Sequence, residues 1–388
     1  MNTTTKHTKK TTSKQGYTMA QKLNSKNKGT TMEKTTYTAL NTKFFTYTGS
    51  KAKYQKDFAA LHKEVNVTTV DTYIEVFAGT LASALHNLEC INAKNIIIND
   101  INPHIVNLYT QIKYNPQAVL ESLKLLEDTF QAYVPEEFKN MRRIKDKTAR
   151  EQRAGHLKDF YNQAKDYYNK KEMTAKTAGV MVFLLNRNFN GLYAESKEGN
   201  YNSSFNWSTK PLNMDNIEEN LINLHNFLTE NNVVIENMEA LALVEKYKGN
   251  KDTFIYLDPP YTDSSVTYNS TNQVADYRTV EAHLHLVAQC KEHFNYVMYS
   301  NTEVAEIMKE FEHSVHFHRT NSISGAYKQT KTSNAEMLCF IDTTISAMPS
   351  VEELLGAVFL NEMPKVDLLL ADNKPANNTK FTSMNITA

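Results

Sequence analysis

Hydrophobic positions along the chain follow two periods, one typical of buried strands and one typical of helices. Short runs of β-branched, aliphatic and aromatic residues at 73–78, 95–99 and 254–257 predict buried strands. Between the second and third runs, apolar residues recur at helical spacing in three sets, namely Ile105, Leu108, Tyr109 and Ile112, then Val119, Leu123, Leu126 and Phe130, then Ile217, Leu221, Leu224 and Phe227. The pattern therefore predicts a mostly helical region inserted into an α/β domain.

Residues 186–206 interrupt the helical pattern near the centre of this inserted region. Gly191 and Gly199 break it, and Tyr201, Ser203 and Phe205 alternate with polar neighbours as in a β-hairpin. The segment is also rich in aromatic side chains, and we expect ordinary packing for two or three of the four, which are Tyr193, Tyr201, Phe205 and Trp207.

The third strand run ends abruptly at Asp258-Pro259-Pro260-Tyr261. Two prolines stop a strand, which leaves a carboxylate, a carbonyl and an aromatic ring at its carboxyl end, where open α/β sheets bind ligands. The carboxylate of Asp258 and the carbonyl of Pro259 could accept the two N–H bonds of an exocyclic amine, and the Tyr261 ring could stack on a planar heterocycle. A rigid turn after a strand is the alternative reading of these four residues alone.

The first strand run leads directly into a glycine turn and the start of a helix. Gly79 follows the strand and residues 81–85 have a helix-forming composition, so the turn and the helix N-terminus could cradle a nucleoside-like ligand. Asp100 ends the second strand about 20 residues further on, where nucleotide-binding folds place an acid on the ribose. Capping of a helix that opens at Asn102-Pro103 is the alternative role for Asp100.

Five segments taken together resemble the Dam-type, or alpha-group, adenine-specific DNA methyltransferases, and they occur in that family's order. They are residues 47–51, 75–79, 99–103, 190–192 and 258–261. The resemblance covers about Phe44 to Asp342, since residues 299–301, 321–324 and 336–338 look like the family's later strands and closing loop. It implies a Rossmann-like S-adenosylmethionine-dependent methyltransferase sheet of the α/β class, with an inserted, mostly helical target-recognition domain that contains a β-hairpin.

The same resemblance sets the expected domain limits. The catalytic methyltransferase domain takes residues 43–112 and 240–345, and the target-recognition insert takes residues 113–239. Residues 1–42, whose first acidic residue is Glu33, predict a disordered basic arm, which either adds nonspecific DNA affinity or is dispensable ahead of a later start such as Met19 or Met32. Residues 346–388 predict a helix, opened by a capping box at 350–353, and a polar tail; the helix either packs on its own domain or docks a partner.

By this resemblance, the chain is expected to move a methyl group from S-adenosylmethionine to the exocyclic amine of an adenine flipped out of double-stranded DNA. The expected catalytic residues are Asp258, Pro259, Pro260 and Tyr261, with the Asp258 carboxylate and the Pro259 carbonyl on the amine and the Tyr261 ring on the base. The expected cofactor-binding residues are Tyr47, Gly49, Lys51, Glu75, Phe77, Ala78, Gly79, Asp100 and Asp258, with Tyr47 near the cofactor's adenine, Lys51 near the reaction centre and Asp100 on the ribose. The expected nucleic acid-binding residues are Lys51, Arg187, Asn190, Gly191, Lys197, Asn202, Arg142 and Arg143.

Three residues depart from the family's pattern. Leu81 stands where the family usually keeps a glycine, Thr46 where Dam proteins carry a base-reading lysine, and Ala194 where they carry a base-reading arginine. Because long cationic side chains are the commonest readers of guanine, we expect a recognition site other than GATC, read partly by residues 188–206, with Arg187 or Lys197 as candidate substitutes. An RNA adenine methyltransferase and a catalytically silent nucleic-acid-binding protein of the same fold are the alternative functions.

Charge and composition change this interpretation little. The formal net charge is +0, so DNA affinity must come from local concentrations of charge. One stretch of the insert is crowded with cations that either contact phosphates or form a solvated helix face: Lys139, Arg142, Arg143, Lys145, Lys147, Arg150 and Arg153.

Cysteine usage and hydropathy bear on the compartment. Cys90, Cys290 and Cys339 are scattered and odd in number, which predicts a reducing compartment without a disulfide framework. Histidines, cysteines and carboxylates do not fall at metal-ligand spacing, so no metal site is expected. We also expect no membrane span and no signal peptide, and therefore a cytoplasmic, DNA-associated protein without a membrane partner.

Overall fold

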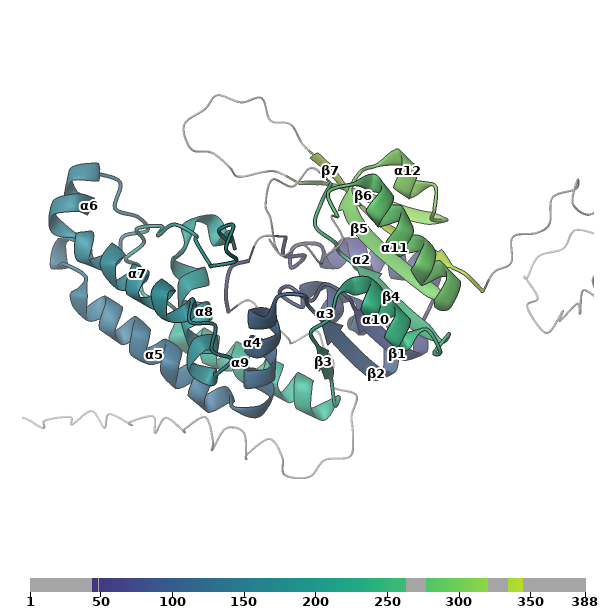
Figure 1. Cartoon of the computed structure of the whole chain (residues 1–388), viewed down its shortest axis with the longest axis horizontal. Coiled ribbons are helices and arrows are strands. Elements are labelled where there is room, and N and C mark those ends of the chain that lie inside the picture. The colour runs from purple at the N-terminus through teal and green to yellow at the C-terminus, as the bar shows by residue number, and fades with distance from the viewer. Residues whose placement is uncertain (1–43, 48, 263–276, 320–333, 345–388) are drawn as a thin grey trace, which may run out of the picture. The chain divides into compact units, whose positions relative to one another are not determined.

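The computed structural model describes residues 44–47, 49–262, 277–319 and 334–344 (Figure 1). The predicted basic arm, the predicted C-terminal helix and tail, and the predicted closing loop at 321–324 lie outside these residues. Within the described ranges, no helix combines the length and the apolar character that a membrane span requires.

A seven-stranded sheet with the order β3-β2-β1-β4-β5-β7-β6 forms the centre of the α/β part. β1 pairs in parallel with β2 and β4, β2 with β3, and β4 with β5, whereas β7 runs antiparallel to both β5 and β6. The strands are β1 (Thr69–Glu75), β2 (Asn92–Asn99), β3 (Val234–Glu236), β4 (Thr253–Leu257), β5 (Tyr296–Thr302), β6 (His313–Arg319) and β7 (Asn334–Asp342). The three predicted strand runs are β1, β2 and β4, and the expected Rossmann-like sheet is confirmed.

Helices cover both faces of the sheet, which explains why β4 is buried along its whole length. Alternate β4 residues enter two separate hydrophobic clusters, with Phe254 and Tyr256 on one face and Ile255 and Leu257 on the other. The first face is covered by α2 (Gln55–Val65) and α3 (Ala82–Cys90), and the second by α10 (Ala240–Tyr247), α11 (Val280–His293) and α12 (Ala305–Met308).

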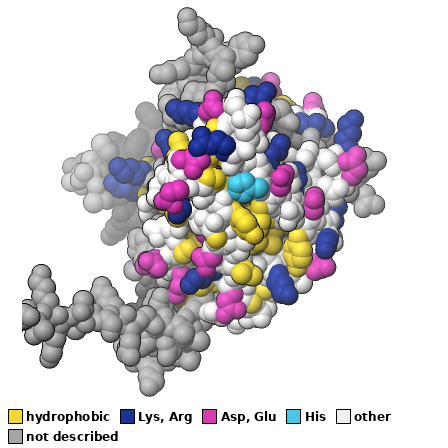
Figure 2. All heavy atoms as spheres, turned by 90° about the vertical axis from the view of Figure 1, so that its left-hand side faces the viewer, with side chains coloured by type: hydrophobic (Ala, Val, Ile, Leu, Met, Phe, Trp, Pro, Cys, Tyr) yellow, Lys and Arg dark blue, Asp and Glu magenta, His cyan; other side chains and the backbone are white. Residues whose placement is uncertain are grey.

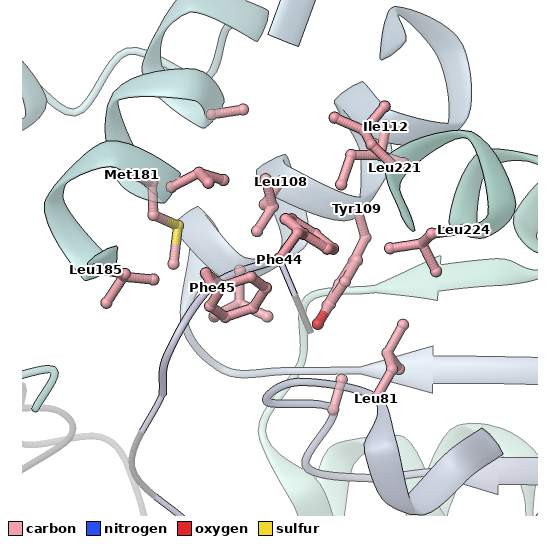
Figure 3. Packing of buried hydrophobic residues seen from close by; sticks show 14 of the residues in the cluster. Phe44, Phe45, Leu81, Leu108, Tyr109, Ile112, Met181, Leu185, Leu221 and Leu224 are labelled. Carbon is pink, nitrogen blue, oxygen red and sulfur yellow. The ribbon is translucent and has the colours of Figure 1, made fainter. Parts of the chain in front are cut away.

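The remaining helices form the predicted helical insert. They are α4 (Pro103–Tyr114), α5 (Pro116–Tyr133), α6 (Lys147–Arg153), α7 (Gly155–Tyr168), α8 (Ala175–Arg187) and α9 (Met214–Glu230), with short 3-10 turns at Glu136–Phe138 and Phe189–Gly191. The three helically spaced apolar sets fall in α4, α5 and α9, as predicted. Side chains of α4, α8 and α9 converge near Phe44, Phe45 and Leu81 (Figure 3), so the insert and the sheet share one hydrophobic core.

Two predicted domain limits differ from the structure. β3 falls within the predicted insert, yet it is the edge strand of the sheet, with Val234 paired to Ile97 of β2. α4 falls within the predicted catalytic range but packs against α8 and α9. The helical part therefore runs from Pro103 to Glu230, and a three-residue strand such as β3 is too short to show a period in the sequence.

The segment at 186–206 folds back on itself as an irregular hairpin. Backbone hydrogen bonds join Asn202 N–H to the Ala194 carbonyl at 2.8 Å and Asn206 N–H to the Arg187 carbonyl at 2.9 Å. The antiparallel arms are predicted correctly, but they form only two isolated bridges within the described segment and no regular ladder. The aromatic prediction is confirmed as well, because Tyr193, Tyr201 and Phe205 are buried and Trp207 is partly buried.

Candidate active site

Asp258 follows β4 at the edge where the parallel strands end, and its carboxylate is held from two sides. Oδ1 accepts a hydrogen bond from the Ser300 hydroxyl of β5 at 2.9 Å. Oδ2 accepts from the Lys51 ammonium at 2.5 Å, and the Lys51 side chain is 2% exposed against 15% for Asp258. Lys51 also donates to the Gly49 carbonyl at 3.2 Å. A carboxylate neutralised by a buried lysine thus stands where the sequence predicts the chemistry.

The rest of the Asp-Pro-Pro-Tyr motif is also held by hydrogen bonds. Asn301 Nδ2 donates to the Pro259 carbonyl at 3.4 Å, which leaves the second lone pair of that oxygen for a ligand. The Tyr261 hydroxyl donates to Glu336 Oε2 of β7 at 2.9 Å. Burial, followed by the charges of Asp258 and Glu336, raises the pKa of Tyr261 well above 10, so the phenol stays neutral and remains a donor. Pro260 is partly exposed.

The glycine turn after β1 is braced by Asp100 and by α4. Gly79 has φ +45°, and its N–H donates to Asp100 Oδ2 at 3.0 Å. The Tyr109 hydroxyl of α4 donates to the Gly79 carbonyl at 2.5 Å. Asp100 Oδ1 accepts from Asn102 N–H at 2.9 Å, and burial raises the pKa of Asp100 to about 6. The cap of α4 is the Asn102 side chain, which accepts from His104 N–H, so Asp100 is not that cap.

Glu75 lies beneath the glycine turn and not at its surface. It is completely buried, and its oxygens accept hydrogen bonds from the hydroxyls of Tyr73 and Ser83. Burial is the largest influence on this carboxyl and raises its pKa to about 8. The predicted cofactor contact of Glu75 is therefore corrected to an indirect one, because both oxygens face the protein interior.

Leu81 occupies a backbone conformation that suits glycine. Its φ of 59° lies in the left-handed region, where a residue with a Cβ is strained by about 1–2 kcal/mol. The side chain is fully buried and points toward the α4 residues of the shared core (Figure 3). Leucine in place of the family's glycine therefore adds backbone strain, and it also adds a buried side chain to the hydrophobic core.

The other predicted cofactor residues surround this turn. Ala78 N–H donates to the Asn99 carbonyl at 2.8 Å, which joins the ends of β1 and β2. The Phe77 ring is partly buried and meets Tyr277 edge to face with the ring centroids 5.6 Å apart. The segment that carries Tyr47 and Lys51 is tied to the turn by the hydroxyls of Ser50 and Thr80, which lie 3.0 Å apart.

Two of the predicted nucleic acid contacts are corrected. Arg187 is 1% exposed, and its Nη2 lies 2.6 Å from each oxygen of Glu127. A buried guanidinium held by a buried carboxylate cannot reach DNA. Gly191 is buried as well, with φ +68°, and a Cβ at this position would fall 2.3 Å from Thr46 Cγ2. Its role is close packing of the hairpin on the segment before Tyr47.

The remaining nucleic acid candidates lie at the surface. Asn190, Lys197 and Asn202 are exposed on the hairpin. Arg142 and Arg143 are exposed in the loop before α6, and the Arg143 guanidinium lies 5.1 Å from the ring centroid of Phe189, itself 39% exposed. The structure thus brings Arg143 to the edge of the Asn190-Gly191 turn, a proximity that the sequence does not reveal.

The crowded cations of the insert differ in their partners, and Arg150 bonds the Ile144 carbonyl and lies over the Trp207 ring. Lys139, Lys147 and Arg153 form ion pairs with glutamates, whereas Arg142 and Arg143 have no carboxylate partner among the described residues. Figure 2, which views the molecule from the side of α6 and α7, shows lysine and arginine interspersed with aspartate and glutamate. The cations of α6 fit the solvated helix face of the alternative interpretation, whereas Arg142, Arg143 and Lys145 lie exposed in the loop before it.

Two buried residues hold the site, although the sequence assigns Tyr109 only to a helix and Glu336 only to a later strand. They are Tyr109, which holds Gly79, and Glu336, which holds Tyr261. A carboxylate within the apolar run of β7 is the one signal that could have identified Glu336. Among the described residues, no group of three or more histidines, cysteines and carboxylates could hold a metal ion.

Several curated proteins are similar to this chain. A type II methyltransferase of Methanocaldococcus jannaschii, M.MjaIII, is 27% identical over 215 residues, which are 55% of this chain and 66% of that protein. The type II methyltransferase M1.LlaDCHI of Lactococcus lactis subsp. cremoris is 24% identical over 233 residues, 58% of this chain and 72% of that protein. A DNA adenine methylase of Vibrio cholerae serotype O1 is 24% identical over 190 residues, 48% of this chain and 56% of that protein.

These matches span between about half and three quarters of the relatives' own lengths. The match to the family as a whole is more extensive in this chain. The model of the D12 class N6 adenine-specific DNA methyltransferases matches residues 47–331, and the chain belongs to this family.

Proposed function

We propose that the chain transfers a methyl group from S-adenosylmethionine to the exocyclic amine of adenine in double-stranded DNA, inside the cell. The observation that carries this proposal is the placement of Asp258, whose carboxylate is displayed beside the Pro259 carbonyl and the Tyr261 ring at the sheet edge. Membership of the adenine-specific DNA methyltransferase family supports the reaction class.

The Asp258 carboxylate and the Pro259 carbonyl can compensate for the weak nucleophilicity of the amine. The amino lone pair of adenine is delocalised into the ring, so the site must orient the nitrogen and stabilise positive charge on it. Asp258 Oδ2 and the second lone pair of the Pro259 carbonyl can each accept one N–H. The Ser300 hydroxyl keeps the Asp258 carboxylate oriented while this exchange takes place. No covalent enzyme intermediate is required.

Lys51 must yield its position when the base binds. Its ammonium holds Asp258 Oδ2 at 2.5 Å, which is the oxygen the amine needs. A cation left in contact with that oxygen would also oppose the positive charge that develops on nitrogen. Lys51 therefore neutralises the partly buried carboxylate before the base arrives, and it keeps its hydrogen bond to the Gly49 carbonyl, 3.2 Å away, when the base displaces it from Asp258.

The surroundings of Gly79 fit the proposed cofactor. An added Cβ at Gly79 would meet no atom closer than 4.0 Å, so space adjoins the turn. Each Asp100 oxygen accepts one backbone N–H and keeps a further lone pair, which suits two ribose hydroxyls. Phe77 and Gly79 would lie against the cofactor and Tyr47 near its adenine. When bound, S-adenosylmethionine supplies an activated methyl group on sulfonium.

Asp100→Asn tests this cofactor assignment. We expect affinity for S-adenosylmethionine to fall by about 1–3 kcal/mol, the range for leaving buried partners unpaired. The hydroxyls need the ionised carboxylate, so affinity of the wild type should also fall as the pH drops below about 6, whereas that of the variant should not. Calorimetric titrations at pH 5 and 7.5 measure both effects. A loss of DNA affinity with unchanged cofactor affinity would contradict the assignment.

The DNA would be gripped by the exposed residues of the hairpin and of the loop before α6. Stacking on Phe189 orders the Arg143 guanidinium while leaving N–H groups for phosphates or base edges. Arg142, Asn190, Lys197 and Asn202 complete the proposed surface. The target adenine would be swung out of the duplex to reach Tyr261.

The recognition site is proposed to differ from GATC. Thr46 and Ala194 are too short to read guanine bidentately, and the buried Arg187 is no longer a candidate substitute. Lys197 is exposed and stays a candidate.

The experiment is expression of the chain in a host without its own adenine methylation, followed by long-read sequencing of the recovered DNA. We expect methylated adenine at a defined site other than GATC. Asp258→Ala should abolish it while cofactor affinity stays nearly unchanged, since Asp258 contacts the base amine. Complete modification confined to GATC would overturn the specificity argument, and substantial turnover by Asp258→Ala would overturn the role of Asp258.

A further inference from the structure

The end of β5 carries hydrogen-bonding side chains that hold the motif after β4. Ser300 Oγ donates to Asp258 Oδ1 at 2.9 Å, and Asn301 Nδ2 donates to the Pro259 carbonyl at 3.4 Å. The hydroxyls of Thr302 and Thr262 lie 3.3 Å apart. Consecutive positions on one rigid strand thus fix the two acceptors of the site and the residue that follows the motif.

The aromatic residue of the motif is held from the neighbouring strand. Glu336 lies on β7 directly opposite Thr302, and its Oε2 accepts the hydrogen bond from the Tyr261 hydroxyl at 2.9 Å. Glu336 is only 2% exposed. Burial of a carboxylate opposes folding unless hydrogen bonds satisfy it, and an apolar residue would serve β7 better as a strand. The position of Glu336 therefore points to a task in the site.

We propose that Glu336 is a positioning residue that fixes the plane of the Tyr261 ring for stacking on the target base, an inference that rests on the proposed function. A tyrosine held only at its backbone can turn about both side-chain torsions. Anchoring the hydroxyl oxygen restricts χ1 because it fixes the far end of the ring, and it restricts χ2 because the phenolic O–H prefers the plane of the ring and must point at the Glu336 carboxylate. Glu336 itself touches neither base nor cofactor.

The place of Lys51 shows why the ring plane matters. Its ammonium lies 5.2 Å from the Tyr261 ring centroid and bonds Asp258 at the same time. A base amine that takes over this bond to Asp258 would lie over the same ring. A tilt of Tyr261 would then shift the base relative to Asp258, and small misplacements of a reacting group cost up to about a hundredfold in rate.

A double-mutant cycle with Tyr261→Phe and Glu336→Leu tests the inference. Each single variant should lower kcat about ten- to hundredfold with cofactor and DNA dissociation constants within about twofold of wild type. The double variant should resemble the singles, because Glu336 acts through the hydroxyl that Tyr261→Phe removes. Glu336→Gln keeps an acceptor oxygen and should retain most activity.

A spectroscopic readout separates positioning from general damage. DNA with 2-aminopurine at the target position brightens when the base leaves the duplex and dims when an aromatic ring stacks on it. We expect brighter complexes for Glu336→Leu than for wild type. Met337→Ala is the matched control, because Met337 is the next residue of β7 and packs in the hydrophobic cluster on the opposite face of the sheet. It should leave kcat and this fluorescence unchanged.

If the proposed function is wrong, the wild type itself will transfer no methyl group, and this result differs from every outcome expected of the variants. Additive losses in the cycle, or a Met337→Ala defect equal to that of Glu336→Leu, would overturn the positioning role. If Glu336→Leu does not fold, Glu336→Gln and Tyr261→Phe decide, and a Gln variant as impaired as Tyr261→Phe would overturn the role of an acceptor at this position.

Discussion

The buried carboxyl of Glu75 should make the fold sensitive to pH, and Glu75→Gln tests this. Burial raises the pKa of Glu75 from 4.5 to about 8, so the side chain is protonated at neutral pH. Glutamine has the same shape and no charge at any pH. The hydroxyls of Tyr73 and Ser83 can donate or accept, so they can also serve an amide.

The sign follows from proton binding. A raised pKa means that the folded protein holds this proton more tightly than the unfolded chain does, so stability falls as the pH rises from about 4.5 through about 8. The difference in pKa between the folded and unfolded states corresponds to about 5 kcal/mol in all, of which about half falls between pH 6 and pH 9. The free energy of unfolding of Glu75→Gln should therefore rise by about 2–3 kcal/mol relative to that of the wild type over this interval.

Urea unfolding followed by circular dichroism at pH 6, 7.5 and 9 measures the difference. Glu292→Gln is the control, because Glu292 is exposed on α11 and its substitution should leave the pH dependence of the wild type unchanged. Parallel stability curves for wild type and Glu75→Gln would refute the reasoning. Cofactor affinity should stay within about twofold of wild type, and a larger loss would mean that Glu75 contacts the cofactor directly.

Three further substitutions test individual contacts. Leu81→Gly should be more stable to urea than Leu81→Ala by about 1 kcal/mol, because φ is 59° there, and the usual order of alanine above glycine would contradict that strain. Gly191→Ala should lower methyl transfer, because the new Cβ would fall 2.3 Å from Thr46 Cγ2. Adding Thr46→Gly removes that atom and should restore most of the activity. If it does not, the backbone strain at φ +68°, and not the clash, causes the loss. Arg143→Ala should weaken DNA binding and reduce its salt dependence by about one released ion. Arg153→Ala should have a much smaller effect, because the Arg153 guanidinium already pairs with the Glu137 carboxylate. Equal effects in titrations at several salt concentrations would mean that both arginines act only through the overall charge of the surface.

The fold could be predicted where the sequence has a long or strong period. Buried parallel strands appear as apolar runs, so β1, β2 and β4 are recognisable, and α4, α5 and α9 show about two to three turns of helical spacing. β3 has three residues and its role depends on pairing with β2, which lies more than a hundred residues earlier. Such non-local pairing leaves no mark in a single sequence.

The sequence singles out candidate site residues, but it does not reveal their contacts. Asp258 and Tyr261 stand out because prolines end a strand beside them. The sequence favours an exposed Arg187, because it is a cation at the end of a helix. Its burial depends on an ion pair with Glu127, 60 residues earlier, which the sequence does not reveal. Arg143 is hard to rank for the opposite reason, since its position over Phe189 depends on how two distant loops meet.

The described residues 44–47 and 49–51 link the hairpin of the insert to the carboxylate of Asp258 through direct contacts. Phe45 is buried in the core that the insert shares with the sheet, and Thr46 packs against Gly191 of the hairpin. A few residues later, Lys51 holds the carboxylate of Asp258. Because only a few residues separate Thr46 from Lys51, the proposed function predicts that a shift of the hairpin on binding DNA moves the Lys51 ammonium. On this proposal, the movement that seats the DNA also frees Asp258 Oδ2 for the amine of the target base.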